Sequence, residues 1–252
     1  LWPQAIRFGA SLSAFHIKSG THSDEGKGMN AVAALPSVRG KLTEGADLAK
    51  LVWFKSGGPA EWLFEPKDIE DLQEFLRNLD PETQVWPLGL GSNLIIRDGG
   101  IQGVVIRLGK AFAGIEVDDL AMQCGAGAPG ISAASMARDH GIAGMEFLRG
   151  IPGTVGGAVR MNAGAYGREV CDILESADVV MRNGDLVTIA LADMGYTYRH
   201  SELPEGSIVV SAKFVGERGD PGTIGAEMKR IADEREASQP LRTKTGGITF
   251  KN

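Results

Sequence analysis

The high glycine content of residues 144–169 limits which secondary structure this stretch can form. This stretch, GMEFLRGIPGTVGGAVRMNAGAYGRE, contains seven glycines in 26 residues, about twice their density in the whole chain. A regular helix is disfavoured, because each interior glycine costs about 0.5–1 kcal/mol relative to alanine, and the stretch is too apolar for a solvated linker. It forms either tight turns between strands or backbone that approaches a ligand closely, with N–H groups that bind oxygen atoms. The presence of Pro152, Asn162 and Tyr166 in the same stretch favours the ligand.

The composition limits the class of protein. A chain of 252 residues is long enough for one large domain or two to three smaller ones. Its net charge of −6 argues against a general nucleic-acid-binding protein, and no apolar run approaches the roughly 20 residues that span a bilayer. No secretory signal is evident, so Cys124 and Cys171 are expected to be reduced thiols of a cytoplasmic protein. The histidines lack the spacing of metal ligands, so no metal site is expected.

Residues 1–28 show no sustained hydrophobic period and end in a tract rich in Ser, Asp, Gly and Lys. Such a segment has no apolar face that could offset the entropy lost on ordering. We expect an extension that is disordered or foreign to the natural protein, the alternative being a genuine N-terminal extension. The segment that begins at Met29 reads like the natural start of the protein.

Hydrophobic periodicity predicts an α+β chain whose first elements follow the order β-β-α-β. Strands are expected at residues 51–54, 62–64, 84–88, 94–97, 104–108, 115–117, 121–124, 176–181, 186–190 and 208–215. Helices are expected from Pro66 to Leu79, from Pro129 to His140, and from Pro221 to the residue before Gln239. Gly141 is expected to cap the second helix in a left-handed conformation, and residues 182–185 are expected to form a hairpin turn.

Two further loops could carry chemistry. Residues 89–93, Gly-Leu-Gly-Ser-Asn, lie between two expected strands, whereas the dinucleotide-binding fingerprint opens a helix. This loop is therefore either a simple turn or a pyrophosphate site made of N–H groups and two polar side chains. Arg199 lies between Tyr198 and His200, in a polar segment that also holds Tyr196. Both a surface arginine and a semi-buried clamp for a carboxylate or phosphate fit this context.

In their order and spacing, these motifs resemble the UDP-N-acetylenolpyruvoylglucosamine reductases from about residue 29 to residue 252. The resemblance rests on SGGPA at 56–60, LGLGSNL at 88–94, GIPGTVGG at 150–157, MNAGAYG at 161–167, YRHS at 198–201 and GITFKN at 247–252. It implies an α+β fold of the vanillyl-alcohol-oxidase and p-cresol-methylhydroxylase type, with two FAD-binding subdomains and a substrate-binding domain. The implied division is 29–87 and 88–218 for the two subdomains, with 219–252 as the start of a truncated third domain.

The resemblance also implies a reaction. NADPH reduces a non-covalently bound FAD, and flavin N5 then delivers hydride to the vinyl carbon of UDP-N-acetylglucosamine enolpyruvate. The product, UDP-N-acetylmuramate, is a peptidoglycan precursor, so such an enzyme serves cell-wall biogenesis, cell shape and cell division. The expected partners are NADPH and the UDP-sugar, without nucleic acid or membrane, and the expected state is a monomer.

The matched motifs imply the site residues. FAD is expected to contact Gly57, Gly58, Pro59, Gly89, Gly91, Ser92, Asn93, Leu94, Gly150, Pro152, Gly153, Thr154, Gly156, Gly157, Asn162, Gly164, Ala165 and Tyr166. Tyr198 and Arg199 are expected to bind the substrate, and Arg199 to stabilise the developing aci-carboxylate. Ile248 occupies the position of the family's proton-donor serine.

Some positions depart from the family pattern. Ile248 has no transferable proton, and the glutamate-bearing remainder of the third domain is expected to be missing. Val52, Lys55 and Ser56 differ from the usual Thr-x-Phe-Arg-Val run. These departures predict FAD binding with little reduction of substrate, and they leave open a catalytically inactive fragment or decayed copy. A third possibility is another flavin oxidoreductase that acts on hydroxy acids, with His200 as its base.

Overall fold

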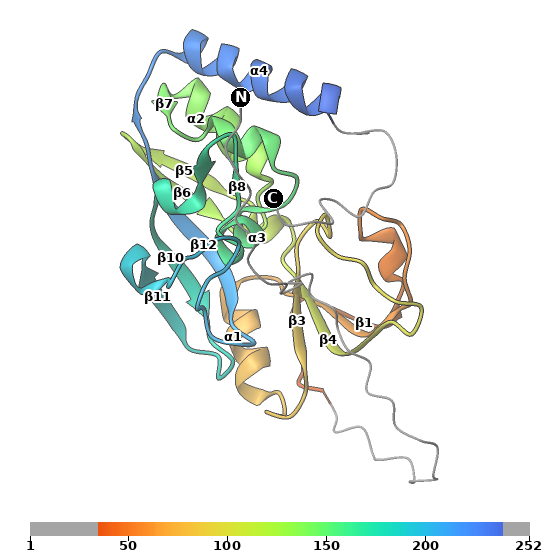
Figure 1. Cartoon of the computed structure of the whole chain (residues 1–252). Coiled ribbons are helices and arrows are strands. Elements are labelled where there is room, and N and C mark those ends of the chain that lie inside the picture. The colour runs from red at the N-terminus through yellow and green to blue at the C-terminus, as the bar shows by residue number, and fades with distance from the viewer. Residues whose placement is uncertain (1–34, 239–252) are drawn as a thin grey trace, which may run out of the picture.

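The computed structural model of the chain describes residues 35–238. Three expectations lie outside this part of the chain: the extension at residues 1–28, the motif at residues 247–252, and the role of Ile248. Within residues 35–238, two large β-sheets and four α-helices form the body of the molecule (Figure 1). None of these helices combines the length and the apolar content needed to cross a bilayer.

The first sheet has four strands and mixes antiparallel with parallel pairing. In spatial order its strands are β1 (Lys41–Ala46), β2 (Ala60–Glu65), β4 (Ile101–Arg107) and β3 (Val85–Leu88). The helix α1 (Ile69–Asn78) follows β2 and packs on it, with the rings of Phe64 and Phe75 4.3 Å apart. Asp68 caps this helix by accepting a hydrogen bond from Asp71 N at 2.9 Å, which fixes where the helix begins.

The strand β4 decides how far this first unit extends. It pairs in parallel with both β2 and β3, so it is a central strand of the sheet. Its buried side chains Val104 and Ile106 share a core with α1. A boundary after residue 87, as expected from the sequence, would separate this strand from its own sheet. We therefore propose that the first subdomain extends through β4.

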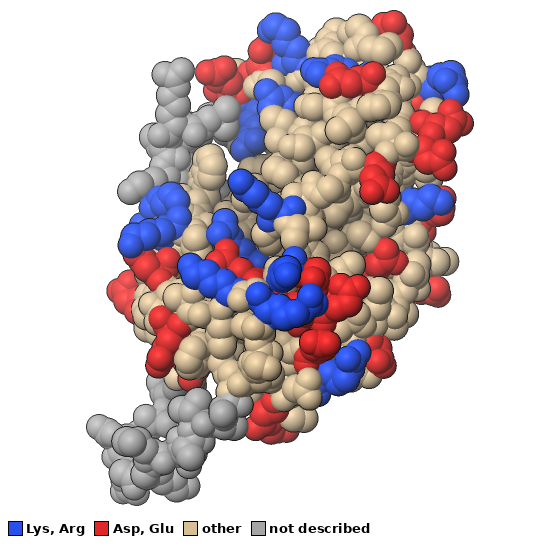
Figure 2. Space-filling model, turned by 180° about the vertical axis from the view of Figure 1, so that it is seen from behind, with Lys and Arg blue, Asp and Glu red and all other residues tan. Residues whose placement is uncertain are grey.

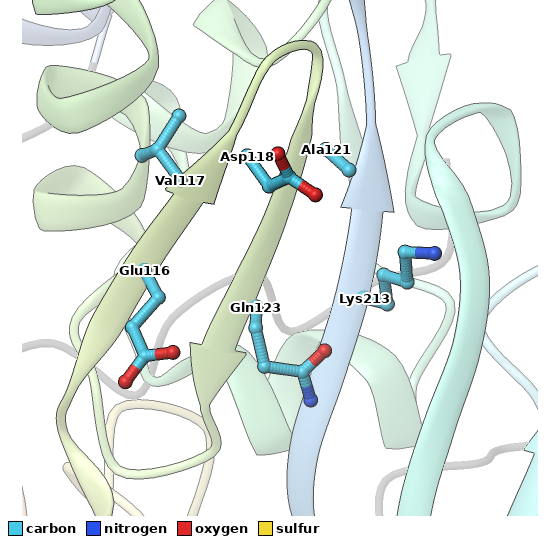
Figure 3. A pocket seen from close by; sticks show the side chains of 6 residues that line it. All are labelled: Glu116, Val117, Asp118, Ala121, Gln123 and Lys213. Carbon is cyan, nitrogen blue, oxygen red and sulfur yellow. The ribbon is translucent and has the colours of Figure 1, made fainter.

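The second sheet has five antiparallel strands. Their spatial order is β11 (Leu186–Ala190), β10 (Leu174–Val180), β12 (Ile208–Val215), β6 (Ala121–Gly125) and β5 (Ile115–Asp118). One face shares a core with α2 (Gly130–Asp139) and α3 (Val155–Arg160), into which Phe214 points. The opposite face is polar beside Gln123 and Lys213, where Figure 3 shows a pocket, whereas its Val180 and Ile208 are buried in the core that contains α1.

Short elements complete the fold. Two-residue strands form two ribbons, β7 (Ile142–Ala143) with β13 (Glu217–Arg218) and β8 (Gly164–Ala165) with β9 (Arg168–Glu169). The 3-10 helices are η1 (Leu48–Lys50), η2 (Lys110–Phe112), η3 (Glu146–Gly150), η4 (Val170–Asp172) and η5 (Leu191–Asp193). The last helix, α4 (Pro221–Ser238), contacts η3 and α2 and lies at the opposite end of the molecule from α1 (Figure 1). It buries Ile224, Met228 and Ile231, as their spacing predicts.

Local sequence signals located several elements correctly. The helices α1 and α2 confirm the two expected before residue 141, and Gly141 has the left-handed φ of +68° expected of a cap. The expected strands at residues 115–117 and 121–124 pair as the hairpin β5–β6, and the expected turn at residues 182–185 joins the hairpin β10–β11. The second of them turns through Gly184, whose φ is +83°. These elements depend on capping and turn residues, which act within a few positions of the chain.

Three expectations about local structure are wrong. Residues 51–54 form a turn after η1, and residues 94–97 form an irregular segment, where strands were expected. Their apolar side chains Val52 and Ile96 are nevertheless buried in one core, and short apolar runs do not distinguish a strand from a buried loop. The glycine-rich stretch contains the six-residue helix α3, which Thr154 caps. The polar edge strand β1 was not expected.

Candidate functional site

Two glycine motifs that are far apart in the sequence are in direct contact. The loop of residues 89–93 follows β3, and its Ser92 Oγ donates a hydrogen bond to Pro152 O at 2.8 Å. A Cβ on Gly89 would lie only 2.6 Å from Thr154 Oγ1. Glycine at position 89 therefore lets this loop lie against the turn that precedes α3, where a larger side chain would collide with Thr154.

The glycines of residues 57–59 allow a close approach between two loops. Gly58 N donates to Arg97 O at 2.9 Å, and a Cβ on Gly58 would lie 2.0 Å from Asp98 O. Gly57 has a φ of +126°, which side chains rarely adopt. This motif thus has a structural reason for its glycines, and its contact with a cofactor stays a prediction.

Some backbone N–H groups of the glycine motifs donate to acceptors in the protein, whereas others have no acceptor in the described residues. At the start of α3, Val155 N donates to Ala128 O at 2.8 Å, so its N–H is used within the protein. Gly156 N likewise donates to Ala126 O at 2.9 Å. In contrast, the N–H groups of residues 91–93 donate to no acceptor within the described part of the chain. Successive free N–H groups form a concave site for anions, so this loop fits the expected pyrophosphate.

Gly150 and Tyr166 lie beside α4. A Cβ on Gly150 would lie 2.4 Å from Cε2 of the Tyr166 ring, so the ring occupies the space above this glycine. Tyr166 Oη donates to Ile231 O at 3.2 Å, and the Arg230 guanidinium carbon lies 5.9 Å from the ring centroid. These contacts hold α4 in place, while a contact of either residue with the cofactor stays a prediction.

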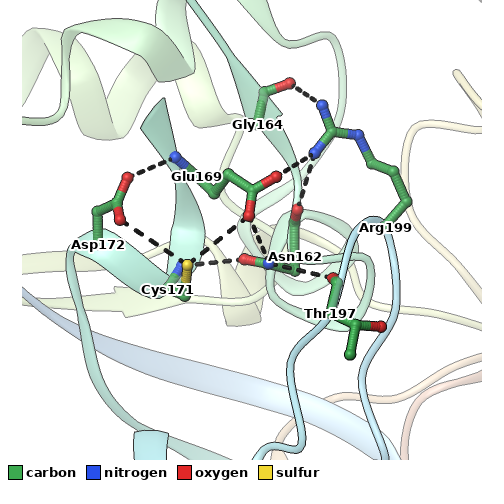
Figure 4. Close-up of polar contacts among 7 residues, drawn as sticks. All are labelled: Asn162, Gly164, Glu169, Cys171, Asp172, Thr197 and Arg199. Carbon is green, nitrogen blue, oxygen red and sulfur yellow. Dashed lines mark hydrogen bonds and ion pairs between the residues drawn. The ribbon is translucent and has the colours of Figure 1, made fainter. Parts of the chain in front are cut away.

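A polar network surrounds the buried amide of Asn162 (Figure 4). Asn162 Nδ2 donates to Glu169 Oε2 at 2.9 Å and to Thr197 O at 3.3 Å. Its Oδ1 accepts a hydrogen bond from Cys171 N at 3.0 Å. Asn162 has a φ of +40°, in the left-handed region that asparagine tolerates better than most residues. The amide thereby connects the segment after α3 to the turn of residues 197–200.

Arg199 extends from that turn into the same network. Its Nη1 donates to Glu169 Oε1 at 3.0 Å and to Asn162 O at 3.2 Å, and its Nη2 donates to Gly164 O. The guanidinium carbon lies 4.7 Å from the centroid of the Tyr198 ring. With 32% of its side chain exposed, Arg199 is an anchored, semi-buried cation. Its contact with a substrate stays a prediction, as does that of Tyr198.

Two neighbouring groups are poor candidates for acid–base chemistry. Burial, together with the Asp172 carboxylate, raises the pKa of the Cys171 thiol, so the thiol stays protonated 3.8 Å from Glu169 Oε2. His200 is exposed, and its backbone pairs with Thr197 within the turn. These surroundings give no support to His200 as the base of a hydroxy-acid oxidoreductase.

Glu169 was not expected in the site, yet it contacts both Arg199 and Asn162. The signal that could have located it is Gly164. A Cβ on Gly164 would lie 2.7 Å from Glu169 Cγ and 2.9 Å from Arg199 Nη1. The sequence shows that a glycine is present, but only the structure shows which side chains require it.

Comparisons with known proteins show which families and folds this chain resembles. Residues 60–190 match the family model described as FAD binding domain. The chain is 67% identical to the UDP-N-acetylenolpyruvoylglucosamine reductase of Sphingopyxis alaskensis, over 89% of this chain and 75% of that protein. It is also 67% identical to the protein of the same description from Novosphingobium aromaticivorans, over 86% of this chain and 73% of that protein.

Solved structures share the fold. The crystal structure of UDP-N-acetylenolpyruvylglucosamine reductase from Thermus caldophilus matches with a TM-score of 0.71 and 32% identity, over 86% of this chain and 76% of that chain. The 6-hydroxy-D-nicotine oxidase from Arthrobacter nicotinovorans matches with a TM-score of 0.56 and 17% identity, over 75% and 44% of the two chains. The second match concerns the fold alone. Together they confirm the expected α+β fold of the vanillyl-alcohol-oxidase and p-cresol-methylhydroxylase type.

Proposed function

The chain belongs to the UDP-N-acetylenolpyruvoylglucosamine reductases, and we propose that it uses NADPH and FAD to reduce UDP-N-acetylglucosamine enolpyruvate to UDP-N-acetylmuramate. The observation that carries this proposal is the anchored guanidinium of Arg199, which stands where the family motif has its substrate-binding arginine. Membership of the family supports an oxidoreductase of peptidoglycan precursor synthesis and does not favour a catalytically inactive copy.

The loop of residues 91–93 is the part of the described chain that best fits FAD. Its N–H donors suit the oxygen atoms of the pyrophosphate. The loop is held in place by the close packing of Gly89 against Thr154. When bound, FAD supplies hydride transfer from NADPH to the substrate. The glycine motifs at 56–60, 88–94, 150–157 and 161–167 contain no cysteine or histidine, so we propose that the cofactor is held without a covalent bond.

Arg199 is the residue that we propose for the substrate carboxylate. Three acceptors occupy one part of its guanidinium, while the Nε–H and one Nη2–H have no acceptor in residues 35–238. Two neighbouring donors of this kind match the two oxygens of a carboxylate. As hydride reaches the vinyl carbon, negative charge grows on the carboxylate, and a cation already held in place stabilises that charge.

In the family, the adjacent carbon is protonated by a serine at the position that is Ile248 here, and residue 248 lies outside the described residues. Isoleucine at position 248 cannot donate a proton, and a positioned general acid typically accelerates such a step about 10²–10⁴-fold. We propose that water supplies the proton and that this step is slow in a chain with Ile248.

The surface charge of the protein bears on its ligands, and the proposal also covers its oligomeric state and its location in the cell. Lys and Arg side chains gather from one edge to the centre of the face seen in Figure 2, with Asp and Glu side chains among them, and the net charge of the chain is −6. A mixed surface of this kind in an acidic protein suits small anions such as a UDP-sugar and NADPH better than nucleic acid. We propose a monomer that works in the cytoplasm and supports cell shape and division through peptidoglycan supply.

The first test separates cofactor binding from substrate binding. Denatured protein should release free FAD, and Arg199→Ala should leave the FAD content unchanged. The same variant should weaken binding of UDP-N-acetylglucosamine enolpyruvate about 10- to 100-fold, as expected for the loss of charge-assisted hydrogen bonds. The affinity is read from the change in flavin absorbance during a titration. Arg218→Ala is the matched control, because this exposed arginine pairs with Asp119 at 2.7 Å on the surface.

Two results would contradict the proposal at different points. Protein that neither carries FAD nor takes it up would contradict the cofactor. Equal loss of FAD and of substrate binding in Arg199→Ala would make Arg199 a structural residue. The reaction itself is followed by anaerobic stopped-flow measurement of reduced flavin, which should be reoxidised slowly when the enolpyruvyl substrate is added.

A further inference from the structure

We propose that Glu169 is a positioning residue for Arg199, which holds the guanidinium in the one orientation that leaves two donors available for the substrate carboxylate. Glu169 belongs to β9 and Arg199 to the turn of residues 197–200, 30 positions apart. The inference rests on the proposed function, because it concerns how Arg199 is prepared for its ligand.

Both oxygen atoms of the Glu169 carboxylate have assigned partners (Figure 4). Oε1 accepts from Arg199 Nη1 at 3.0 Å, and Oε2 accepts from Asn162 Nδ2 at 2.9 Å. Glu169 side-chain exposure is 33%, so solvent screens its charge in part. A carboxylate bonded on both sides cannot rotate without breaking a hydrogen bond, and it therefore fixes the Nη1 end of the guanidinium.

Asn162 in turn fixes Glu169. Asn162 is 1% exposed, and its amide donates twice through Nδ2 and accepts once through Oδ1 from Cys171 N at 3.0 Å. The second Nδ2 bond goes to Thr197 O, in the same turn that carries Arg199. The amide thus sets both the carboxylate and the backbone from which the arginine extends. Rotation of the amide would break three hydrogen bonds at once.

Positioning and charge predict opposite effects, which makes the role testable. If Glu169 acted only through its charge, Glu169→Gln would leave Arg199 more attractive to an anion, and substrate would bind more tightly. If Glu169 acts by positioning, the glutamine is unsuitable, because its amide nitrogen cannot accept from Asn162 while its oxygen serves Arg199. Glu169→Asp separates the two effects further, since it keeps the charge but is one methylene too short to reach both partners.

The experiment uses the FAD-loaded chain and two ligands. UDP-N-acetylglucosamine enolpyruvate carries the carboxylate that Arg199 is proposed to bind, whereas UDP-N-acetylglucosamine lacks it. We expect Glu169→Gln and Glu169→Asp each to weaken binding of the first ligand about tenfold and to leave binding of the second unchanged. In an Arg199→Ala background, Glu169→Gln should have no further effect on either ligand. Glu175→Gln is the matched control, because Glu175 pairs with Lys213 on the polar face of the second sheet.

Each other outcome overturns the inference in a distinct way. Tighter binding by Glu169→Gln with no change in Glu169→Asp would assign Glu169 a charge effect only. A further loss in the Arg199→Ala background, or equal loss for both ligands, would make Glu169 a structural residue. FAD content and thermal unfolding, measured for every variant, show whether a loss reflects misfolding. Wild-type chain that binds FAD but not the enolpyruvyl ligand would refute the proposed substrate, and the inference with it.

Discussion

Gly89→Ala tests whether the contact between the loop after β3 and the turn before α3 supports the cofactor site. A Cβ on Gly89 would lie 2.6 Å from Thr154 Oγ1 and 3.3 Å from Thr154 Cγ2. The φ of Gly89 is outside the left-handed region, so alanine suits the local backbone and the effect comes from the collision. Thr154 cannot rotate away freely, because its Oγ1 caps α3 by accepting from Gly157 N at 3.4 Å.

The size of the effect follows from these contacts. Overpacking of this kind costs about 1–3 kcal/mol, and the loss of a threonine N-cap costs about 1 kcal/mol. We therefore expect Gly89→Ala to lower the free energy of unfolding by about 1–3 kcal/mol. Because residues 91–93 would shift with position 89, we expect the affinity for FAD to fall by about 5- to 150-fold, which is the same free energy expressed as a ratio.

A double-mutant cycle identifies the collision as the cause. Thr154→Ala alone loses the cap, but in the Gly89→Ala background it also removes both atoms with which the new Cβ collides. The double variant should therefore be more stable than the sum of the two single effects predicts, by about 0.5–3 kcal/mol. Stability is measured by urea denaturation and FAD affinity by flavin fluorescence. Gly114→Ala is the control, because a Cβ on Gly114 would have no neighbour within 4 Å.

Two results would refute this reasoning. If the two substitutions were additive, the Cβ at position 89 would not collide with Thr154. If Gly89→Ala lowered stability but left FAD affinity at the wild-type value, the contact would support the fold and not the cofactor site.

Two further predictions concern buried groups. Asp71, 2% exposed, accepts three backbone N–H groups, so Asp71→Asn should lower the free energy of unfolding by about 2–3 kcal/mol; a urea midpoint at the wild-type value would contradict this. Burial raises the pKa of the Cys124 thiol from 9.0 to about 12. The neutral thiol is thus favoured in the folded state, and its contribution to stability should be complete below pH 9 and be lost as the pH rises toward 12. Alkylation of native protein at pH 8 should therefore spare Cys124, and rapid labelling there would show that this core opens.

Much of the secondary structure could be predicted because its signals are local. The hydrophobic period of the helix expected from Pro66 to Leu79, the left-handed Gly141 and the turn at Gly184 each act through neighbours in the chain. They place α1, α2 and the β10–β11 hairpin without any tertiary contact. The same reasoning failed for residues 51–54 and 94–97, because burial of Val52 and Ile96 comes from the packing of loops in a shared core.

The extent of the first unit could not be predicted from the sequence. The parallel partners of β4 come from β2 and β3, and the choice of partners depends on how the whole sheet assembles. In the sequence, the motifs after residue 87 form one unbroken series. In the structure, the strand β4, which lies within this series, belongs to the first sheet. We therefore propose that a boundary drawn from motif order falls inside a unit that hydrogen bonds hold together.

By itself, the sequence determined the family, the fold class and the identity of the glycine motifs, since these depend on residue types in a fixed order. Only the tertiary structure decided what each glycine is for: Gly89 makes room for Thr154, and Gly164 makes room for Glu169 and Arg199. The same holds for the network itself, whose carboxylate and guanidinium lie 30 residues apart. No local pattern encodes that contact, because it exists only once separate loops have been brought to the same place by the packing of the sheets beneath them.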